Sequence, residues 1–270
     1  MSNNELLNLN YCITLNFKRC LLVTGKIIIN LNTTKITPMK SLLYSMVILL
    51  YCVDANAQCN TFFPIKEKVK YHFDFFDKKD KLSLRTTQTL KNVTGGGNSM
   101  KATMVQEMID VKKDKLIGTS ESDWTCDNGT LHFSVNNFAF GGDQQATMGE
   151  GMAMDVTGDQ MDIPSSFEVG QTLKDLTYQI KMSVSGMTMM NRSYNVKDRK
   201  VESMESITTP AGTFDCYKIS FTTTSQGGMG SGTMKSVVWY AKDVGMVKTE
   251  NYNEKGNLIG RQVLSKIENL

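Results

Sequence analysis

The sequence predicts an all-β protein: an antiparallel bent sheet or (half-)barrel of about ten or more strands. Apolar and polar residues alternate with a period of two along many short segments, and turns rich in glycine, asparagine or aspartate separate these segments. No segment keeps a 3.6-residue apolar period over three helical turns. An antiparallel sheet with this many strands tends to curl into a barrel or a strongly bent half-barrel.

Five strands are expected in the first half of the sheet. The first begins at Val69, where large apolar residues alternate with Lys70, His72 and Asp74. The clearest hairpin signal is Asp127-Asn128-Gly129, because Asn-Gly pairs suit the tight turns that join antiparallel strands. The five expected strands cover residues 69–75, 82–86, 100–108, 116–126 and 131–135.

The second half of the sheet follows a different stretch, residues 141–170. That stretch is rich in Gly, Met and Asp and weakly patterned, so we expect a long loop or lid between the two halves. The cleanest period-two pattern in the chain comes next. The expected strands are 176–184, 214–224, 233–240, 246–252 and 258–267.

Length and charge exclude several classes of protein. The chain has 270 residues and a formal net charge of +3, and we expect a single β domain over residues 58–270. Without residues 1–57 the basic and acidic side chains are equal in number, which argues against a nucleic-acid partner. No apolar run reaches the roughly 18–20 residues of a membrane-spanning helix, so no transmembrane span is expected in the mature chain.

A secretory signal peptide is predicted at residues 39–57. Lys40 supplies the positive charge, residues 41–53 form the apolar stretch, and a small-residue motif ends at Ala57. Cleavage between Ala57 and Gln58 would release an exported protein, located in the periplasm or outside the cell.

Alternatives stay open at both ends of this segment. Cys59 could carry a lipid as the first residue of a lipoprotein, although Gln58 is not the small residue that such a cysteine usually follows. The apolar segment could also remain uncleaved as an anchor. Residues 1–38 precede a complete signal peptide, so we interpret them as an over-extended start and Met39 as the initiator. A genuine long N-terminal region is the other interpretation.

Three cysteines remain after processing: Cys59, Cys126 and Cys216. We predict a disulfide between Cys59 and Cys126, because it would tie a loose terminus to the end of a hairpin in an oxidising compartment. Cys216 lies in a strand-like run and would stay free as a small buried apolar residue. The pairings Cys59–Cys216 and Cys126–Cys216 are the alternatives.

Catalytic motifs are missing from the sequence. Each of the two histidines, His72 and His132, lies on the polar face of a strand, where a solvated or hydrogen-bonded role is expected rather than general-base work. The glycine-rich run around Ser231 matches neither a nucleophile elbow nor a phosphate-binding loop. We therefore expect no enzyme, no cofactor and no metal site.

Eighteen methionines are an excess that needs a reason, and fifteen of them follow residue 57. They could fill an adaptable apolar core, line a promiscuous pocket, or hold Cu(I) through the thioethers of Met152, Met154 and the run 187–190. Core packing is the simplest of the three interpretations.

Two C-terminal motifs carry a family resemblance. Residues 209–219 (TPAGTFDCYKI) and 238–248 (VWYAKDVGMVK) resemble exported Bacteroidota proteins of the TapB family, near the DUF3108-like domains. The resemblance covers roughly residues 58–267 and extends to the Gln58-Cys59 start and to Cys126 before a glycine turn. It implies an all-β exported protein, and it supplies no catalytic residues.

These observations lead to a function hypothesis without catalysis. We expect an exported cell-envelope protein that binds or carries a lipid-like or other apolar ligand; the alternatives are a structural or interaction protein with no small ligand and, third, a hydrolase. Its partner would be an apolar small molecule or an envelope protein. The side chains expected to line a ligand site are Tyr71, Phe73, Phe75, Phe133, Tyr178, Ile180 and Met182.

Overall fold

The computed structural model describes residues 59–63, 66–133, 152–227 and 231–270. The chain divides into two units, Met1–Ala55 and Asn56–Leu270, and every described residue belongs to the second. The predicted signal peptide at 39–57, the segment 1–38 and the cleavage site lie outside the described residues. In the described part of the chain, no helix is long and apolar enough to cross a membrane.

The described residues form thirteen strands in one sheet, and each pair of neighbouring strands is antiparallel. The order across the sheet is β6-β8-β9-β10-β11-β12-β13-β1-β2-β3-β4-β5-β7. The strands are β1 (Val69–Asp77), β2 (Leu82–Gly96), β3 (Ser99–Asp110), β4 (Lys115–Asp127), β5 (Thr130–Phe133), β6 (Met152–Gly158), β7 (Met161–Ile163), β8 (Leu176–Val184), β9 (Met187–Thr209), β10 (Gly212–Gln226), β11 (Gly232–Ala241), β12 (Gly245–Asn253) and β13 (Leu258–Asn269).

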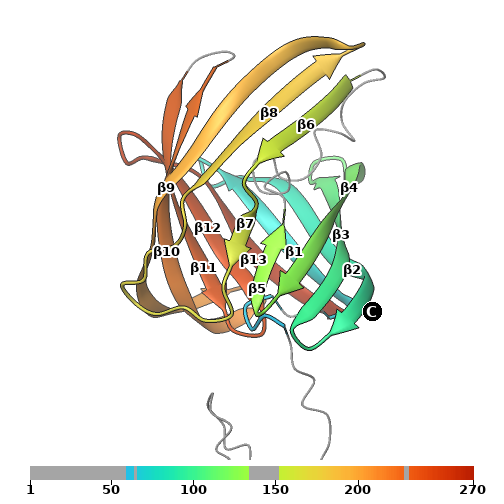
Figure 1. Cartoon of the computed structure of the whole chain (residues 1–270), viewed down its shortest axis with the longest axis vertical. Coiled ribbons are helices and arrows are strands. Elements are labelled where there is room, and N and C mark those ends of the chain that lie inside the picture. The colour runs from blue at the N-terminus through green and yellow to red at the C-terminus, as the bar shows by residue number, and fades with distance from the viewer. Residues whose placement is uncertain (1–58, 64–65, 134–151, 228–230) are drawn as a thin grey trace, which may run out of the picture. The chain divides into compact units, whose positions relative to one another are not determined.

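The sheet curls until its two edges meet. β6 and β7 are the outermost strands of the order, yet only Asp159 and Gln160 separate them in sequence. Because consecutive Cα atoms are 3.8 Å apart, this connection keeps the two edges within about 11 Å of each other at this corner. Figure 1 shows the result: β1 to β5, β7 and β10 to β13 curve around a common interior, and β6, β8 and the first half of β9 extend beyond it as an arm.

The all-β prediction is confirmed, and all ten predicted strands are present. The predicted turn Asp127-Asn128-Gly129 joins β4 to β5, with φ of 47° at Asn128 and 82° at Gly129. Both angles lie in the left-handed region that Asn and Gly tolerate best, and two such residues make the turn whose twist matches an antiparallel hairpin.

The prediction of a long loop over residues 141–170 was wrong in part. Residues 152–158 and 161–163 are strands β6 and β7, which form the two edges of the sheet. An edge strand pairs on one side only, and β7 is just three residues long, so neither leaves a strong alternating pattern. Residues 141–151 lie outside the described part of the chain, and 164–170 connect β7 to the segment before β8.

Strand β9 is the longest in the sheet, with 23 residues, and the sequence did not predict it. Its pairing with β10 shifts register opposite Lys218–Ile219 and Ser220–Thr222, and Asp198 has φ of 57°. Each bulge moves the following side chains to the opposite face, so the period-two pattern is lost although the strand continues.

Candidate functional site

The structure distributes the predicted ligand-site residues over two clusters on the inner face of the sheet. Phe73 and Phe133 are buried in the main core, and Tyr71 and Phe75 pack against it. A second cluster lies on the arm. It contains Tyr178, Ile180 and Met182 together with Leu176 and Val196. The predicted set is therefore not one continuous site.

The N-terminal segment, residues 59–63, lies inside the main core and was not predicted there. We call these residues the plug. Cys59 is joined to Cys126 by a disulfide, as predicted, while Cys216 is free and buried. The hydroxyl of Thr61 donates to the carbonyl oxygen of Ser165 over 2.6 Å, so the plug has a second attachment two residues after the disulfide.

Asn60 holds the plug through its side-chain amide. It is 1% exposed. Its Nδ2 donates to the carbonyl oxygens of Gly129, over 2.9 Å, and Ile163, over 2.8 Å. Its Oδ1 accepts from the backbone N–H groups of Phe62, over 2.9 Å, and Phe63, over 3.2 Å. A buried amide with both ends satisfied stabilises the segment it joins, here the plug, the β4–β5 turn and β7.

Aromatic rings fill the interior around the plug. The ring of Phe62 lies 4.3 Å from that of Phe167 and meets Tyr217 edge-on at 5.6 Å, measured between centroids. The ring of Phe63 meets Trp124 edge-on at 5.2 Å and Tyr240 at 5.7 Å. Burial raises the pKa of Tyr240 to about 12, as expected for a phenol away from water.

A hollow of only about 20 Å³ lies beside Phe63, against Tyr71, Phe73 and Trp124. That volume has room for about one water molecule. Among the described residues, no hydrogen-bond partner reaches the buried indole Nε1 of Trp124. At this end, Tyr71 and Phe73 therefore pack against the plug.

The inner wall formed by β2 to β4 is not uniformly apolar. Gln106 is 2% exposed and accepts a hydrogen bond from Gln88 Nε2 over 3.1 Å. In the part of the chain that the structure describes, the buried hydroxyls of Thr86 and Ser120 have no hydrogen-bond partner. A wall of amides and hydroxyls is costly to bury against hydrocarbon, so this part of the interior is poorly suited to a fatty chain.

The outer face of the sheet has a core cluster of its own, centred on Trp239. The ammonium groups of Lys218 and Lys248 lie 5.6 and 4.8 Å from its ring centroid, and its Nε1 donates to Glu205 Oε1 over 2.6 Å. Long charged side chains thus cover an apolar ring while their charges stay near water. Within the described residues, these contacts account for the burial of Trp239 on the outer face.

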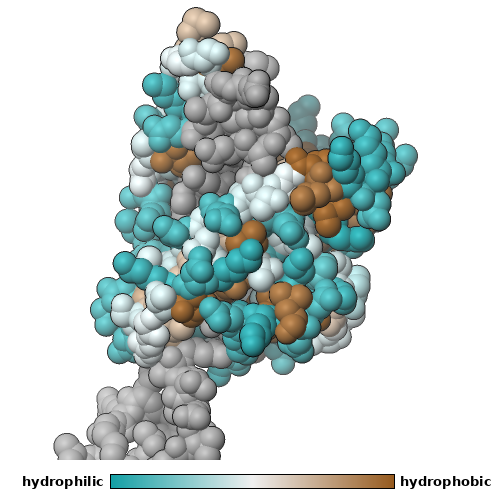
Figure 2. Space-filling model, turned by 90° about the vertical axis from the view of Figure 1, so that its right-hand side faces the viewer, coloured by the Kyte–Doolittle hydropathy of each residue, from teal (hydrophilic) through white to brown (hydrophobic). Residues whose placement is uncertain are grey.

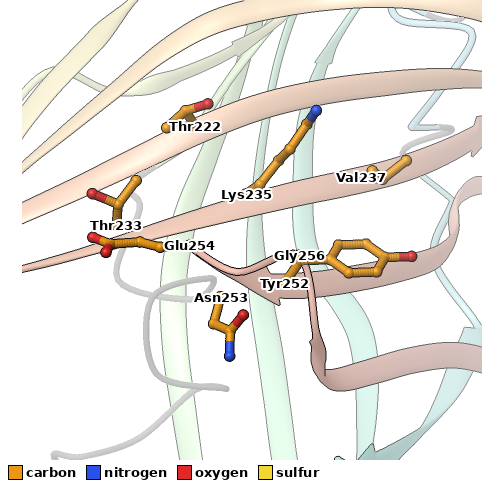
Figure 3. A pocket seen from close by; sticks show the side chains of 8 residues that line it. All are labelled: Thr222, Thr233, Lys235, Val237, Tyr252, Asn253, Glu254 and Gly256. Carbon is orange, nitrogen blue, oxygen red and sulfur yellow. The ribbon is translucent and has the colours of Figure 1, made fainter.

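A groove of about 460 Å³ lies beside this cluster on the outer face (Figure 3). Val237 and the ring of Tyr252 give it apolar surface, and Lys235, which is exposed, is its cation. It is built from β10, β11, β12 and the β12–β13 turn. The lining residues are Thr222, Thr233, Lys235, Val237, Tyr252, Asn253, Glu254 and Gly256.

The candidate acid–base groups and the free thiol are engaged in structural roles. His72 Nε2 lies 2.9 Å from Glu268 Oε2, and His132 Nδ1 lies 2.7 Å from Asp162 Oδ1, so both histidines are hydrogen-bonded, as predicted. Burial raises the pKa of the Cys216 thiol to about 12, which keeps it protonated and a poor nucleophile.

The surface shown in Figure 2 carries hydrophobic residues in separate patches among hydrophilic ones. The large apolar side chains that are most exposed come from different parts of the chain. Those more than half exposed are Leu116, Val169, Met187, Met189, Met204 and Leu270. Isolated residues of this kind are common on soluble proteins, whereas Met187 and Met189 are close neighbours on one hairpin.

Comparison with known proteins agrees with the fold. An exported-protein candidate with a YmcC-like fold from Bacteroides fragilis NCTC 9343 is similar, with a TM-score of 0.65 and 23% identity over 78% of this chain and 100% of that one. A lipoprotein candidate from Parabacteroides distasonis ATCC 8503 has a TM-score of 0.64 and 21% identity over 78% of this chain and 99% of its own. No curated protein matches the chain.

The family is established by a sequence model. The DUF3108-like model matches residues 66–264, which include both C-terminal motifs that carried the resemblance. The DUF3108-like part of that resemblance is confirmed, and the TapB label stays a prediction. The match spans most of the chain, from the strand after the plug to the last strand of the sheet, and this protein belongs to the DUF3108-like family.

Proposed function

We propose that this protein is exported to the cell envelope and acts there by interaction, without catalysis. The segment 39–57 has the features of a signal peptide, and two proteins of the same fold are described as an exported-protein candidate and a lipoprotein candidate. N-terminal sequencing of the exported form tests this placement. We expect a start at Gln58; a lipid-bearing start at Cys59 would favour the anchored alternative, and an intact N-terminus would contradict export.

The buried plug is the observation that favours an interaction role for this protein over a ligand-carrier role. Phe62, Phe63 and Phe167 occupy the interior where Tyr71, Phe73 and Phe133 were expected to line a ligand site. A lipid-like guest would have to displace an aromatic cluster held by a disulfide and by Asn60. The outer surface is therefore the better place for a binding partner.

Titration of the mature protein with a fluorescent fatty-acid analogue tests this choice. The interaction role predicts no saturable binding by the wild type. A variant with Tyr178→Ala, Ile180→Val and Met182→Ala reports on the arm, and Leu116→Ala, at an exposed site, is its control. Saturable binding that weakens in the triple variant but not in the control would contradict the proposal and restore the carrier hypothesis.

A second candidate function rests on the outer groove. Its volume of about 460 Å³ is in the range of small-molecule sites, and Val237 and Tyr252 offer apolar surface to an amphiphile. Lys235 could pair with an anionic head, and the carboxylate of Glu254, which also lines the groove, would oppose one. The same titration distinguishes it. Binding to the groove would weaken in Lys235→Gln and would be unchanged in the triple variant of the arm.

A further inference from the structure

We propose that the inner face of the β6–β8–β9 arm is a binding site for Cu(I), held by methionine thioethers. Met182 of β8 lies directly opposite Met190 of β9 in the sheet register, and Val184 lies opposite Met187. Directly opposed residues project to the same face, with Cβ atoms about 4.5–5.5 Å apart. Val184 is two residues from Met182, so it shares that face as well.

A bulge brings the third thioether onto this face. Met187 and Met190 are three residues apart, and in a regular strand they would face opposite sides. The register shifts between Met182 and Ser183, and Met189 is the extra residue of β9. Met182, Met187 and Met190 therefore share one face near the end of the arm.

The backbone of strand β6 continues this part of the sheet. Met154 pairs with Met182, and Met152 pairs with Val184. Two methionine-rich stretches that are more than thirty residues apart in sequence become adjacent in the sheet.

Core packing accounts for only part of this set, because Met182 and Met190 pack against the apolar cluster of the arm whereas Met187 lies largely in solvent. Met104, Met108 and Met246 are 4–7% exposed, as filler residues of a core should be. Met187 is 68% exposed and Met189 69%, while Met182 and Met190 are only half-buried. Met182, Met187 and Met190 are thus each at least partly exposed, which leaves a path from solvent to this face.

The chemistry of this face selects a soft, monovalent cation. Neutral thioethers bind Cu(I) and the similar Ag(I), and they discriminate against hard cations, which prefer oxygen ligands. Arg192, opposite Ile180, places a charged residue on the same face. Its guanidinium is turned toward β10, where Nη2 donates to Ser225 Oγ over 3.0 Å, and it lies 5.9 Å from the ring centroid of Tyr194.

Titration of the mature protein with Ag(I), and with Cu(I) against bicinchoninate under anaerobic conditions, tests the proposal. Leucine matches methionine in volume, so Met182→Leu combined with Met190→Leu removes two thioethers with little effect on folding. The wild type should bind one equivalent, and the double variant should bind it about tenfold or more weakly. Met204→Leu, on the same strand and also exposed, should bind as the wild type does.

Methyl NMR of methionine-labelled protein locates the ion. The signals of Met182, Met187 and Met190 should shift at one equivalent, and that of Met204 should not. Cys216→Ala should leave the affinity unchanged, because its buried thiol is not part of the set. Equal affinity in the double variant and the wild type, loss of binding in Cys216→Ala, or no binding by the wild type would each overturn the proposal.

Discussion

The side-chain amide of Asn60 supplies two donors and two acceptor positions at one buried point, a combination that only Asn and Gln offer. Its four bonds connect the plug to the β4–β5 turn and to β7. The charge-neutral amide avoids the desolvation cost that an aspartate would carry at the same place. Asn60 thus contributes, with the disulfide and Thr61, to holding the following aromatic rings in the core.

Replacement of Asn60 by alanine should destabilise the protein by about 2–4 kcal/mol, because two buried carbonyl oxygens and two N–H groups lose their partner. Urea unfolding of the mature protein measures the loss. Asn257→Ala, at an exposed position in the β12–β13 turn, is the control and should change stability by about 0.5 kcal/mol or less. An Asn60→Ala variant as stable as the control would show that the plug is not held in this way.

At the scale of the strands, a hydrogen-bonded ion pair connects three neighbours, β1, β2 and β3. Glu107 of β3 accepts hydrogen bonds from Thr87 of β2, over 2.8 Å, and from Lys70 of β1, over 3.0 Å. The hydrogen bond from Thr87, and then that from Lys70, lowers the pKa of Glu107 below its usual value. The carboxylate form is therefore favoured in the folded state.

This shift gives the sheet an acid-dependent contribution. Because the folded-state pKa lies below the unfolded one, the stabilisation is present above the unfolded pKa and is lost as pH falls through the folded pKa. Glu107→Gln should be less stable than the wild type at pH 7, and the difference should shrink under acid conditions in urea unfolding measured as a function of pH. Glu121→Gln, an exposed carboxylate of β4, should show a smaller difference at pH 7. A pH-independent difference for Glu107→Gln would contradict this account.

Strands that follow the period-two rule could be predicted from sequence, and strands that break it could not. In β8, Leu176, Tyr178 and Ile180 are buried and the residues between them exposed, which is the pattern that identified the strand. In β9, Arg199 is 3% exposed, and its guanidinium Nη1 donates to the carbonyl oxygen of Lys174 over 2.7 Å. Because arginine is usually exposed, the sequence predicts a surface position for Arg199, whereas the structure buries its guanidinium against backbone acceptors.

The candidate site was harder to predict because it depends on tertiary contacts. The disulfide could be predicted from the placement of Cys59 and Cys126, but the depth of the plug could not. The signal in the sequence is the pair Phe62-Phe63 just after an asparagine, and it becomes meaningful only once the β4–β5 turn and β7 are known to lie beside it. The Met pairing on the arm likewise depends on a bulge that no sequence period reveals.

At the scale of the described molecule, the curling of the sheet and the burial of the plug occur at the same end. The β6–β7 corner brings the sheet edges together, and the Arg199 side chain reaches from β9 to the carbonyl oxygen of Asp162 in β7 over 3.2 Å. The plug then fills the closed end, where it meets rings from both halves of the sheet. Because the plug fills one end of the interior, the outer face of the sheet and the arm are the surfaces that we expect partners to contact.

Loss of the disulfide should weaken this arrangement strongly. Cys59 and Cys126 are 67 residues apart, so the chain-entropy model gives a contribution of about 4 kcal/mol to the free energy of unfolding. The Cys59→Ser, Cys126→Ser variant should lose about 2–5 kcal/mol in urea unfolding. Cys216→Ala, which leaves the cross-link intact, separates this effect from general thiol chemistry. A double variant as stable as the wild type would mean that the covalent link adds nothing to the plug.

The plug itself is tested most directly by hydrogen exchange of the backbone amides of Phe62 and Phe63, both of which donate to Asn60 Oδ1. In the oxidised mature protein these amides should exchange as slowly as the central amides of β11 and β12, on the order of 10³-fold or more below the unstructured rate. Exchange of the Phe62 and Phe63 amides at the rate of an unstructured terminus, while the strands stay protected, would show that the plug does not fill the interior. It would thereby contradict the interaction role, which depends on that filled interior.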